Sequence, residues 1–214
     1  ELANTLGVAA GAVLPGASLQ GLPERLIAHG MDRVYVVQDD RLGFYQTGPY
    51  SRAVGALIEK HLPQIVLYGA TPLGRDLAPR VGSEMRAGMT ADCTDLEIKD
   101  VMDSRAKETH EKLLLQIRPA FGGNIIATIV NYDMWPQMAT VREGVMPMVE
   151  PDSSRPGEII EEHVELPDEL FAVRLIERHV EARTVNLKGA RVIAAGGGGV
   201  GSRQKFRLIH ELAG

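Results

Sequence analysis

The sequence has little cysteine, no long apolar run and no concentration of positive charge. Cys93 is the only cysteine among 214 residues, so the chain can form neither an internal disulfide nor a metal site made of several thiolates. A single thiol is typical of a reducing compartment such as the cytosol or an organelle matrix. No uninterrupted apolar stretch approaches the roughly 20 residues that a membrane-spanning helix needs.

The net charge and the absence of known motifs argue against nucleic-acid binding, a metal site and nucleophilic catalysis. The formal net charge of -5 is unfavourable for a nucleic-acid partner, because neutralising phosphates requires clustered Lys and Arg. The six histidines are scattered without ligand spacing, so no metal site is expected. No nucleophile lies beside a base, and no catalytic residue is predicted. Asp92 and Asp95 resemble an acid–base pair, but they fit better as caps of a turn and a strand start.

Short β-rich runs alternate with helical patterns over the first 130 residues. The strands expected from this pattern are 8–14, 34–37 and 64–68, and the helices are 19–29 and 50–61. Alternation with short connections predicts right-handed crossovers and a parallel sheet. We therefore expect an α/β fold of three layers, a mostly parallel sheet with helices on both faces.

After residue 88 the chain is β-rich with less helix between the strands. The strands expected here are 93–98, 112–119, 124–130 and 138–142, continuing the sheet with an antiparallel excursion near 104–112. The polar Pro/Gly/Ser stretch 150–157 is the best linker candidate. The expected organisation is an N-terminal α/β domain over 1–150, a linker with connecting strands over 151–186, and the beginning of a second α/β domain over 187–214.

A glycine-rich loop follows an apolar run near the end of the chain, RVIAAGGGGVGSRQKFRLIHELAG. The run 191–195 predicts a strand, and a basic helix is expected over 201–213. Gly196, Gly198 and Gly201 satisfy G-x-G-x-x-G, the pattern of a dinucleotide-binding turn. Only 13 residues follow Gly201, so the acidic residue that an NAD site carries about 20 positions on cannot be seen.

A second candidate site lies where the strand 64–68 ends. Thr71 can cap a helix that begins near Leu73, leaving free N–H groups in the crevice at the carboxyl end of the strand. Such a position suits an anion. An ordinary crossover helix with surface arginines explains the same residues.

Several longer motifs together resemble the electron transfer flavoprotein alpha-subunit family. They are GRDLAPR at 74–80, ADCT at 91–94, RPAFGGNIIATI at 118–129 and QMATVREG at 137–144. The glycine loop, with Phe206 and the ELA of 211–213, resembles the entry into that family's FAD-binding domain.

The resemblance implies a heterodimer with a beta subunit and an alpha subunit that carries FAD in its C-terminal domain. Such a protein is an electron carrier subunit rather than a stand-alone catalyst. It relays electrons between a dehydrogenase, of the acyl-CoA dehydrogenase kind, and an acceptor, and some bacterial relatives bifurcate electrons. A cytoplasmic location is expected, or the mitochondrial matrix in a eukaryote. The rest of the FAD site is expected beyond residue 214. An NAD-dependent dehydrogenase fragment and a non-redox adenylate-binding or structural module are the alternatives.

The resemblance also suggests the residues that contact a cofactor. They are Arg118 and the loop residues Gly196, Gly197, Gly198, Gly199, Gly201 and Ser202. Family members usually have arginine where this chain has Gly198, and Arg203 is the nearest substitute for that charge. We expect Arg118 to face the partner subunit's flavin, or else to bind a carboxylate of its own domain. For Arg142 a surface ion pair is the simpler expectation.

Overall fold

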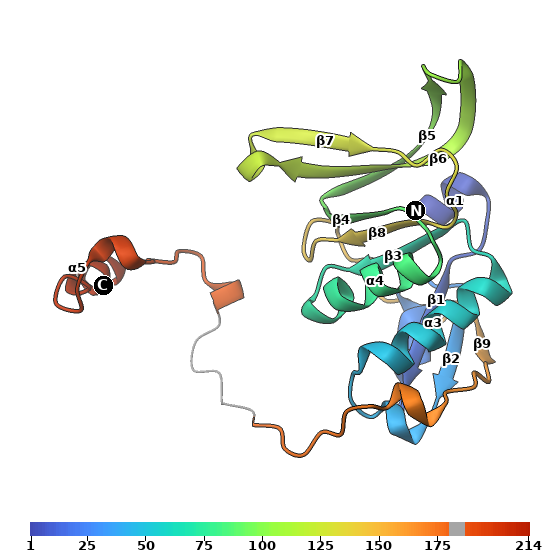
Figure 1. Cartoon of the computed structure of the whole chain (residues 1–214), viewed down its shortest axis with the longest axis horizontal. Helices are drawn as coiled ribbons and strands as arrows, with labels where there is room; N and C mark the ends of the chain where they lie inside the picture. Colours follow the sequence, from blue (N-terminus) through green and yellow to red (C-terminus); the bar gives the residue numbers. More distant parts are fainter. Residues whose placement is uncertain (180–186) are drawn as a thin grey trace. The chain divides into compact units, whose positions relative to one another are not determined.

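The computed structural model describes residues 1–179 and 187–214 (Figure 1). The chain divides into two compact units, unit 1 (Glu1–Arg174) and unit 2 (Leu175–Gly214). The helices of unit 1 are α1 (Leu2–Leu6), α2 (Leu22–Ala28), α3 (Thr47–His61) and α4 (Pro72–Glu84), with the 3-10 turns η1 (Asp40–Leu42), η2 (Phe121–Gly123) and η3 (Asp168–Leu170). Its strands are β1 (Gly11–Gly16), β2 (Arg33–Gln38), β3 (Ile65–Gly69), β4 (Met89–Cys93), β5 (Asp95–Asp103), β6 (Glu108–Ala120), β7 (Ile125–Ile129), β8 (Gln137–Val141) and β9 (Glu158–Glu161).

Two parallel sheets form the body of unit 1. One has the order β1-β2-β9 and the other β3-β8-β4, and every strand pair in both is parallel. The α/β class with parallel sheets flanked by helices is therefore confirmed. The expectation of one continuing sheet was wrong, because the described strands form separate sheets, with β8 between β3 and β4 in one and β9 beside β2 in another.

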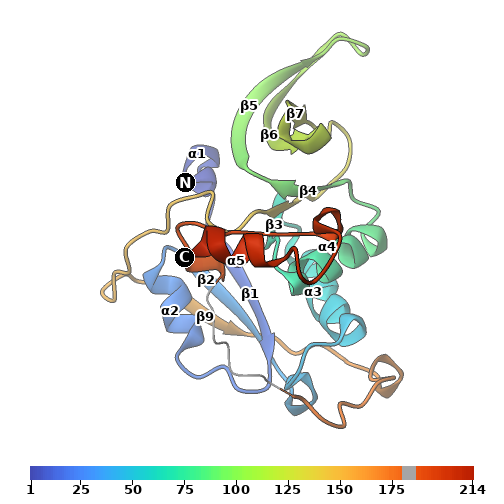
Figure 2. The same cartoon turned by 90° about the vertical axis from the view of Figure 1, so that its left-hand side faces the viewer.

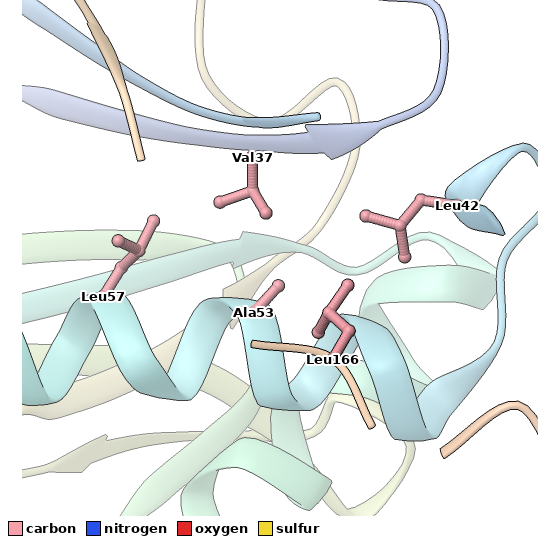
Figure 3. Close-up of a cluster of buried hydrophobic side chains, with 5 residues drawn as sticks. All are labelled: Val37, Leu42, Ala53, Leu57 and Leu166. Carbon is pink, nitrogen blue, oxygen red and sulfur yellow. The ribbon is translucent and has the colours of Figure 1, made fainter. Parts of the chain in front are cut away.

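Helices cover both faces of the sheet that contains β2. Successive side chains of a strand point to opposite faces. Val34 and Val36 accordingly pack with Leu19 and the Ile27 side chain of α2. The other face is covered by α3. Its cluster comprises Val37, Leu42, Ala53, Leu57 and Leu166, all buried (Figure 3). Figure 2 shows α2 and α3 on opposite sides of β1 and β2.

The antiparallel part of the chain is a separate sheet rather than an excursion of the main one. Its strand order is β5-β6-β7, and both pairings are antiparallel. The single strand expected over 93–98 is two strands, β4 and β5, with Thr94 between them. The backbone N–H of Thr94 donates to the Ile117 carbonyl at 2.8 Å. The chain changes sheets at this point, a long-range effect that a local pattern does not carry (Figure 2).

The residues that follow β8, including the expected linker 150–157, pack against the first part of unit 1. The Asp152 N–H donates to the Ala28 carbonyl at 2.9 Å, and Arg155 pairs with Asp32 at 2.7 Å. Gly157 lies directly against Ile27, which a Cβ at that position would approach to 2.6 Å. Strand β9 then joins β2, and the compact unit continues to Arg174. The domain boundaries expected at 150 and 187 stay a prediction.

In unit 2 the described elements are η4 (Leu187–Gly189), η5 (Gly198–Val200) and α5 (Arg207–Ala213). The strand expected over 191–195 is not formed, because no described segment hydrogen-bonds beside it. The helix expected from residue 201 begins at Arg207, after turns. Across both described ranges, none of the helices has the length and apolar character needed to span a bilayer.

Candidate functional site

The carboxyl ends of three parallel strands meet at one edge of unit 1. In the sheet β3-β8-β4, Gly69 at the end of β3 and Cys93 at the end of β4 both pair with Val141, the last residue of β8. Ligand sites of open α/β sheets lie at such edges. The predicted residues Thr71, Asp92 and Arg142 follow or end these strands.

Thr71 caps α4 as the sequence predicts. Its Oγ1 accepts a hydrogen bond from the Gly74 N–H at 3.1 Å, and its carbonyl accepts one from the Arg75 N–H at 2.9 Å. Gly74 is required here, because a Cβ would overlap the carbonyl oxygen of Gly69. The first turn of α4 therefore packs directly on the end of β3.

Asp92 is the centre of an ion-pair network. Arg142 donates from Nη2 at 2.7 Å and from Nε at 3.2 Å, and Arg75 donates from Nη2 at 3.2 Å. The Asp92 N–H donates to Thr140 Oγ1 at 2.8 Å. Its backbone is left-handed, with φ of 63°, a conformation that Asp tolerates better than most residues. The Arg142 hydrogen bond, with the charges of Arg142, Arg75 and Arg118, lowers the pKa of the Asp92 carboxyl.

The expectations for this cluster are thus met in part. Arg142 makes the surface ion pair that was expected. Asp95 accepts from the N–H of Leu96 at the start of β5, as a cap would. Asp92 does not cap a strand, because its carboxylate binds the two arginines instead.

Arg118 lies half-buried in β6, opposite Ala127 of β7. Its Nε donates a long hydrogen bond to the Pro119 carbonyl at 3.5 Å. Within the described ranges no carboxylate forms a salt bridge with it, so the expected tie to a carboxylate of its own domain is not found there. The Arg118 charge still contributes to lowering the pKa of Asp92.

Cys93 is fully buried beside this network. Burial raises the pKa of its thiol, while the Arg118 charge opposes that rise. A buried thiol with a raised pKa is a poor nucleophile, because the thiolate is the reactive form. Cys93 therefore acts as a core residue here, in contact with Leu96, Leu114 and Ala139.

The glycine loop of unit 2 forms a tight turn with open backbone. The Val200 N–H donates to the Gly197 carbonyl at 3.0 Å, and the Gly201 N–H to the Gly198 carbonyl at 3.1 Å. Gly201 has φ of 79°, which favours glycine. A Cβ on Gly197, Gly198 or Gly199 would meet nothing within 4 Å, so a ligand can reach the backbone there.

Gly196 is needed for a different reason. A Cβ at this position would lie 2.8 Å from Ile209 and 3.0 Å from Phe206. The loop is thus pressed against the helical segment that follows it. The geometry matches the role of glycine in allowing a loop and a helix to approach closely.

An open pocket of about 580 Å³ lies between the loop and that helical segment. Its lining includes Gly197, Gly198, Gly201, Ser202, Arg203 and Arg207. Arg207 pairs with Glu211 at 2.9 Å. Arg203 forms no salt bridge with another described residue and lines the same pocket as Gly198, which places a positive charge beside the loop.

Two members of the Asp92 network were not predicted from the sequence. They are Arg75, which donates to the Asp92 carboxylate, and Thr140, whose hydroxyl accepts from the Asp92 N–H. A usable signal was the spacing of two between Thr140 and Arg142, because side chains two apart along an extended strand lie on the same face. Nothing local connects Arg75 on α4 with Asp92, since the tertiary fold brings them together.

Comparison with known proteins gives a consistent picture. The family model described as "Electron transfer flavoprotein domain" matches residues 1–167. An electron transfer flavoprotein subunit alpha of Thermoanaerobacterium thermosaccharolyticum is 42% identical over 100% of this chain and 62% of the relative. The corresponding subunit of Megasphaera elsdenii is 39% identical over 99% of this chain and 61% of the relative. Subunit LctC of an Acetobacterium woodii lactate dehydrogenase (NAD(+),ferredoxin) is 36% identical over 100% of this chain and 49% of the relative. The chain thus spans less than two thirds of these relatives.

Proposed function

The chain belongs to the electron transfer flavoprotein family and is similar along its length to alpha subunits, and from this premise we propose that the protein relays electrons through FAD. It does so as one subunit of a heterodimer with a beta subunit, between a dehydrogenase of the acyl-CoA dehydrogenase kind and an acceptor. In this role the protein is an electron carrier and not a catalyst by itself.

The glycine loop is the observation that carries this proposal. Gly197, Gly198 and Gly199 leave the backbone accessible, and Arg203 adds a positive charge to the same pocket. A pyrophosphate needs this combination of close backbone approach and positive charge. The residues present therefore fit the phosphate end of FAD.

The loop residues contribute to the proposed FAD site in different ways. The backbone of Gly197, Gly198, Gly199 and Gly201 is open and can approach the phosphates. Gly196 completes the loop by letting it pack closely against the helical segment, and Ser202 lines the pocket. Arg203 supplies the charge that Gly198 cannot. FAD, when bound, accepts and releases the electrons, and the protein sets how firmly it is held and at what potential.

Arg118 is proposed to face the flavin of the partner subunit. Two observations support this: Arg118 is half-buried, and no described carboxylate neutralises its charge by a direct ion pair. A guanidinium can donate hydrogen bonds to an electron-rich ring edge and stabilise negative charge that develops there.

Replacing Arg118 by Ala in the complete heterodimer tests this role. We expect the reduction potential of the partner's flavin to fall, because a positive charge that stabilises the reduced form is removed. The control is Arg105→Ala, an exposed arginine in the turn between β5 and β6, which should leave the potential unchanged. An unchanged potential in Arg118→Ala contradicts the proposed role.

Electron bifurcation is a second candidate function. It is favoured by the similarity to LctC, a subunit of an enzyme whose name includes both NAD(+) and ferredoxin. The proposed location is the cytoplasm, a reducing compartment in which the single cysteine, Cys93, stays a free thiol.

A further inference from the structure

Gln116 is a buried amide whose polar side-chain atoms have no partner. It lies in β6, the middle strand of the antiparallel sheet, and its exposed fraction is 0%. Within the described part of the chain, neither its Nε2 nor its Oε1 makes a hydrogen bond. Buried polar groups are nearly always paired, because an unpaired group loses its hydrogen bonds to water without replacing them. An amide at this position therefore weakens the core unless a partner reaches it.

A second glutamine nearby shows what a structural amide does. Gln137, at the start of β8, is also fully buried. Its Oε1 accepts from the Leu114 N–H at 2.6 Å, and its Nε2 donates to the Asn131 carbonyl at 3.3 Å. Gln137 thus ties β8 to β6 and to the segment after β7. Gln116 makes no such tie, so packing of the two sheets does not account for it.

The neighbours of Gln116 on its face of the sheet include a single hydrogen-bond donor. Leu96 of β5 and Ile129 of β7 lie directly opposite Gln116. Along β6, side chains two residues apart share a face, so the remaining neighbours are Leu114 and Arg118. All of these side chains except that of Arg118 are apolar. Arg118 lies about 7 Å along the strand, a span that two long side chains can bridge.

Arg118 has donors where Gln116 has an unused acceptor. A guanidinium carries several N–H groups and accepts no hydrogen bonds. Among the described residues, the only hydrogen bond of Arg118 is the long one from Nε to the Pro119 carbonyl. Fixing such a flexible side chain on a ligand costs rotational freedom, and a neighbour that holds it in place lowers this cost.

We propose that Gln116 is a positioning residue for Arg118, an inference that rests on the proposed role of Arg118. The carboxamide oxygen of Gln116 accepts a hydrogen bond from the guanidinium and fixes the orientation in which Arg118 faces the flavin of the partner subunit. The single chain does not make this bond, and we expect it to form in the heterodimer. A neutral amide suits the task, because a carboxylate would also accept from the guanidinium but would cancel its charge.

The reduction potential of the partner's flavin in the complete heterodimer tests the inference. Gln116→Met replaces the amide by an apolar side chain of similar length. We expect the potential to fall as in Arg118→Ala but by less, because Arg118 keeps its charge and loses its fixed orientation. Combining Gln116→Met with Arg118→Ala should give the potential of Arg118→Ala alone, since Gln116 acts only through Arg118.

Leu114→Met is the matched control, because Leu114 is buried on the same face of β6 and has no polar side-chain atom. It should leave the potential unchanged. A wild-type potential in Gln116→Met, beside a lowered potential in Arg118→Ala, would overturn the inference and leave the role of Arg118 intact. Additive shifts in the combined variant would also overturn it, because Gln116 would then act independently of Arg118.

Hydrogen exchange of the Arg118 guanidinium decides the inference whatever Arg118 faces. It is followed by NMR on the heterodimer with isotope-labelled arginine, and the signal is assigned by its loss in Arg118→Ala. We expect exchange about tenfold faster in Gln116→Met than in wild type, and no change in Leu114→Met. Equal rates in wild type and Gln116→Met would overturn the inference. An unchanged potential in Arg118→Ala, by contrast, contradicts only the proposed role of Arg118.

Discussion

Asp92 combines two features that make it sensitive to substitution. Its backbone is left-handed, and its carboxylate joins Arg75 on α4 to Arg142 after β8. Asn tolerates the same backbone conformation but carries no charge. The substitution Asp92→Asn therefore removes the ion pairs while leaving the backbone unstrained, which makes it the informative change.

The pH dependence of unfolding should report this carboxylate. The pKa of Asp92 is lowered in the folded state, chiefly by the Arg142 hydrogen bond, so its contribution is fully present above about pH 4 and disappears as the pH falls through the folded pKa. We predict that Asp92→Asn is less stable than wild type by about 1 kcal/mol at pH 7. The difference should shrink as the solution is acidified below pH 4.

Urea denaturation of both proteins between about pH 7 and pH 3 is the measurement. Arg142→Gln removes the main partner of Asp92 and should weaken the same acid dependence. A difference between Asp92→Asn and wild type that stays constant over the whole range would show that the charge is not the cause.

At this scale the sequence predicted the cap of Thr71 and the ion pair of Arg142, because both depend on neighbouring residues or a strand end. It did not predict which carboxylate Arg142 binds. That partner comes from β4, 50 residues earlier, and only the parallel pairing of β4 with β8 brings the two together.

At the scale of elements, α4 contains two glycines with opposite requirements. A Cβ on Gly74 would overlap the Gly69 carbonyl oxygen, whereas a Cβ on Gly82 would lie 3.7 Å from its nearest neighbours, an ordinary contact. Alanine normally stabilises a helix relative to glycine by about 1 kcal/mol. The two positions should therefore respond with opposite sign.

We predict that Gly74→Ala destabilises the protein by about 2 kcal/mol or more, because the first turn of α4 must move away from β3. Gly82→Ala should be neutral or stabilising by up to about 1 kcal/mol. Chemical denaturation of the two variants beside wild type measures both values. Similar effects from the two substitutions would mean that α4 does not pack on β3 as described.

Most helices and strands of unit 1 were predictable, because their apolar periodicity reflects local burial. The differences arise where pairing is long-range. Strands β4 and β5 look like one run but belong to different sheets. A connecting strand was expected in the region of β9, but its pairing with β2, more than 120 residues earlier in the chain, has no local signal. The run 191–195 has the composition of a strand, but hydrogen bonding to a neighbour defines a strand, and no described segment provides it.

At the scale of the molecule, the chain divides into two compact units that contain different candidate sites. Unit 1 contains the sheets, with the Asp92 network at the carboxyl edge of β3-β8-β4 and Arg118 on β6 of the antiparallel sheet. Unit 2 contains the glycine loop with Arg203 in its pocket. The sequence predicted this loop from its spacing, whereas the position of Arg203 beside Gly198 required the structure.

The proposed electron relay through FAD is best tested by the visible absorption spectrum of the full-length protein, purified together with its beta subunit, before and after chemical reduction. An electron carrier that holds FAD should show flavin bands in the oxidised protein that bleach on reduction, with FAD released when the protein is denatured. The intact mass of the same sample establishes that the chain is complete. A complete, folded protein without flavin absorbance would contradict the proposed function.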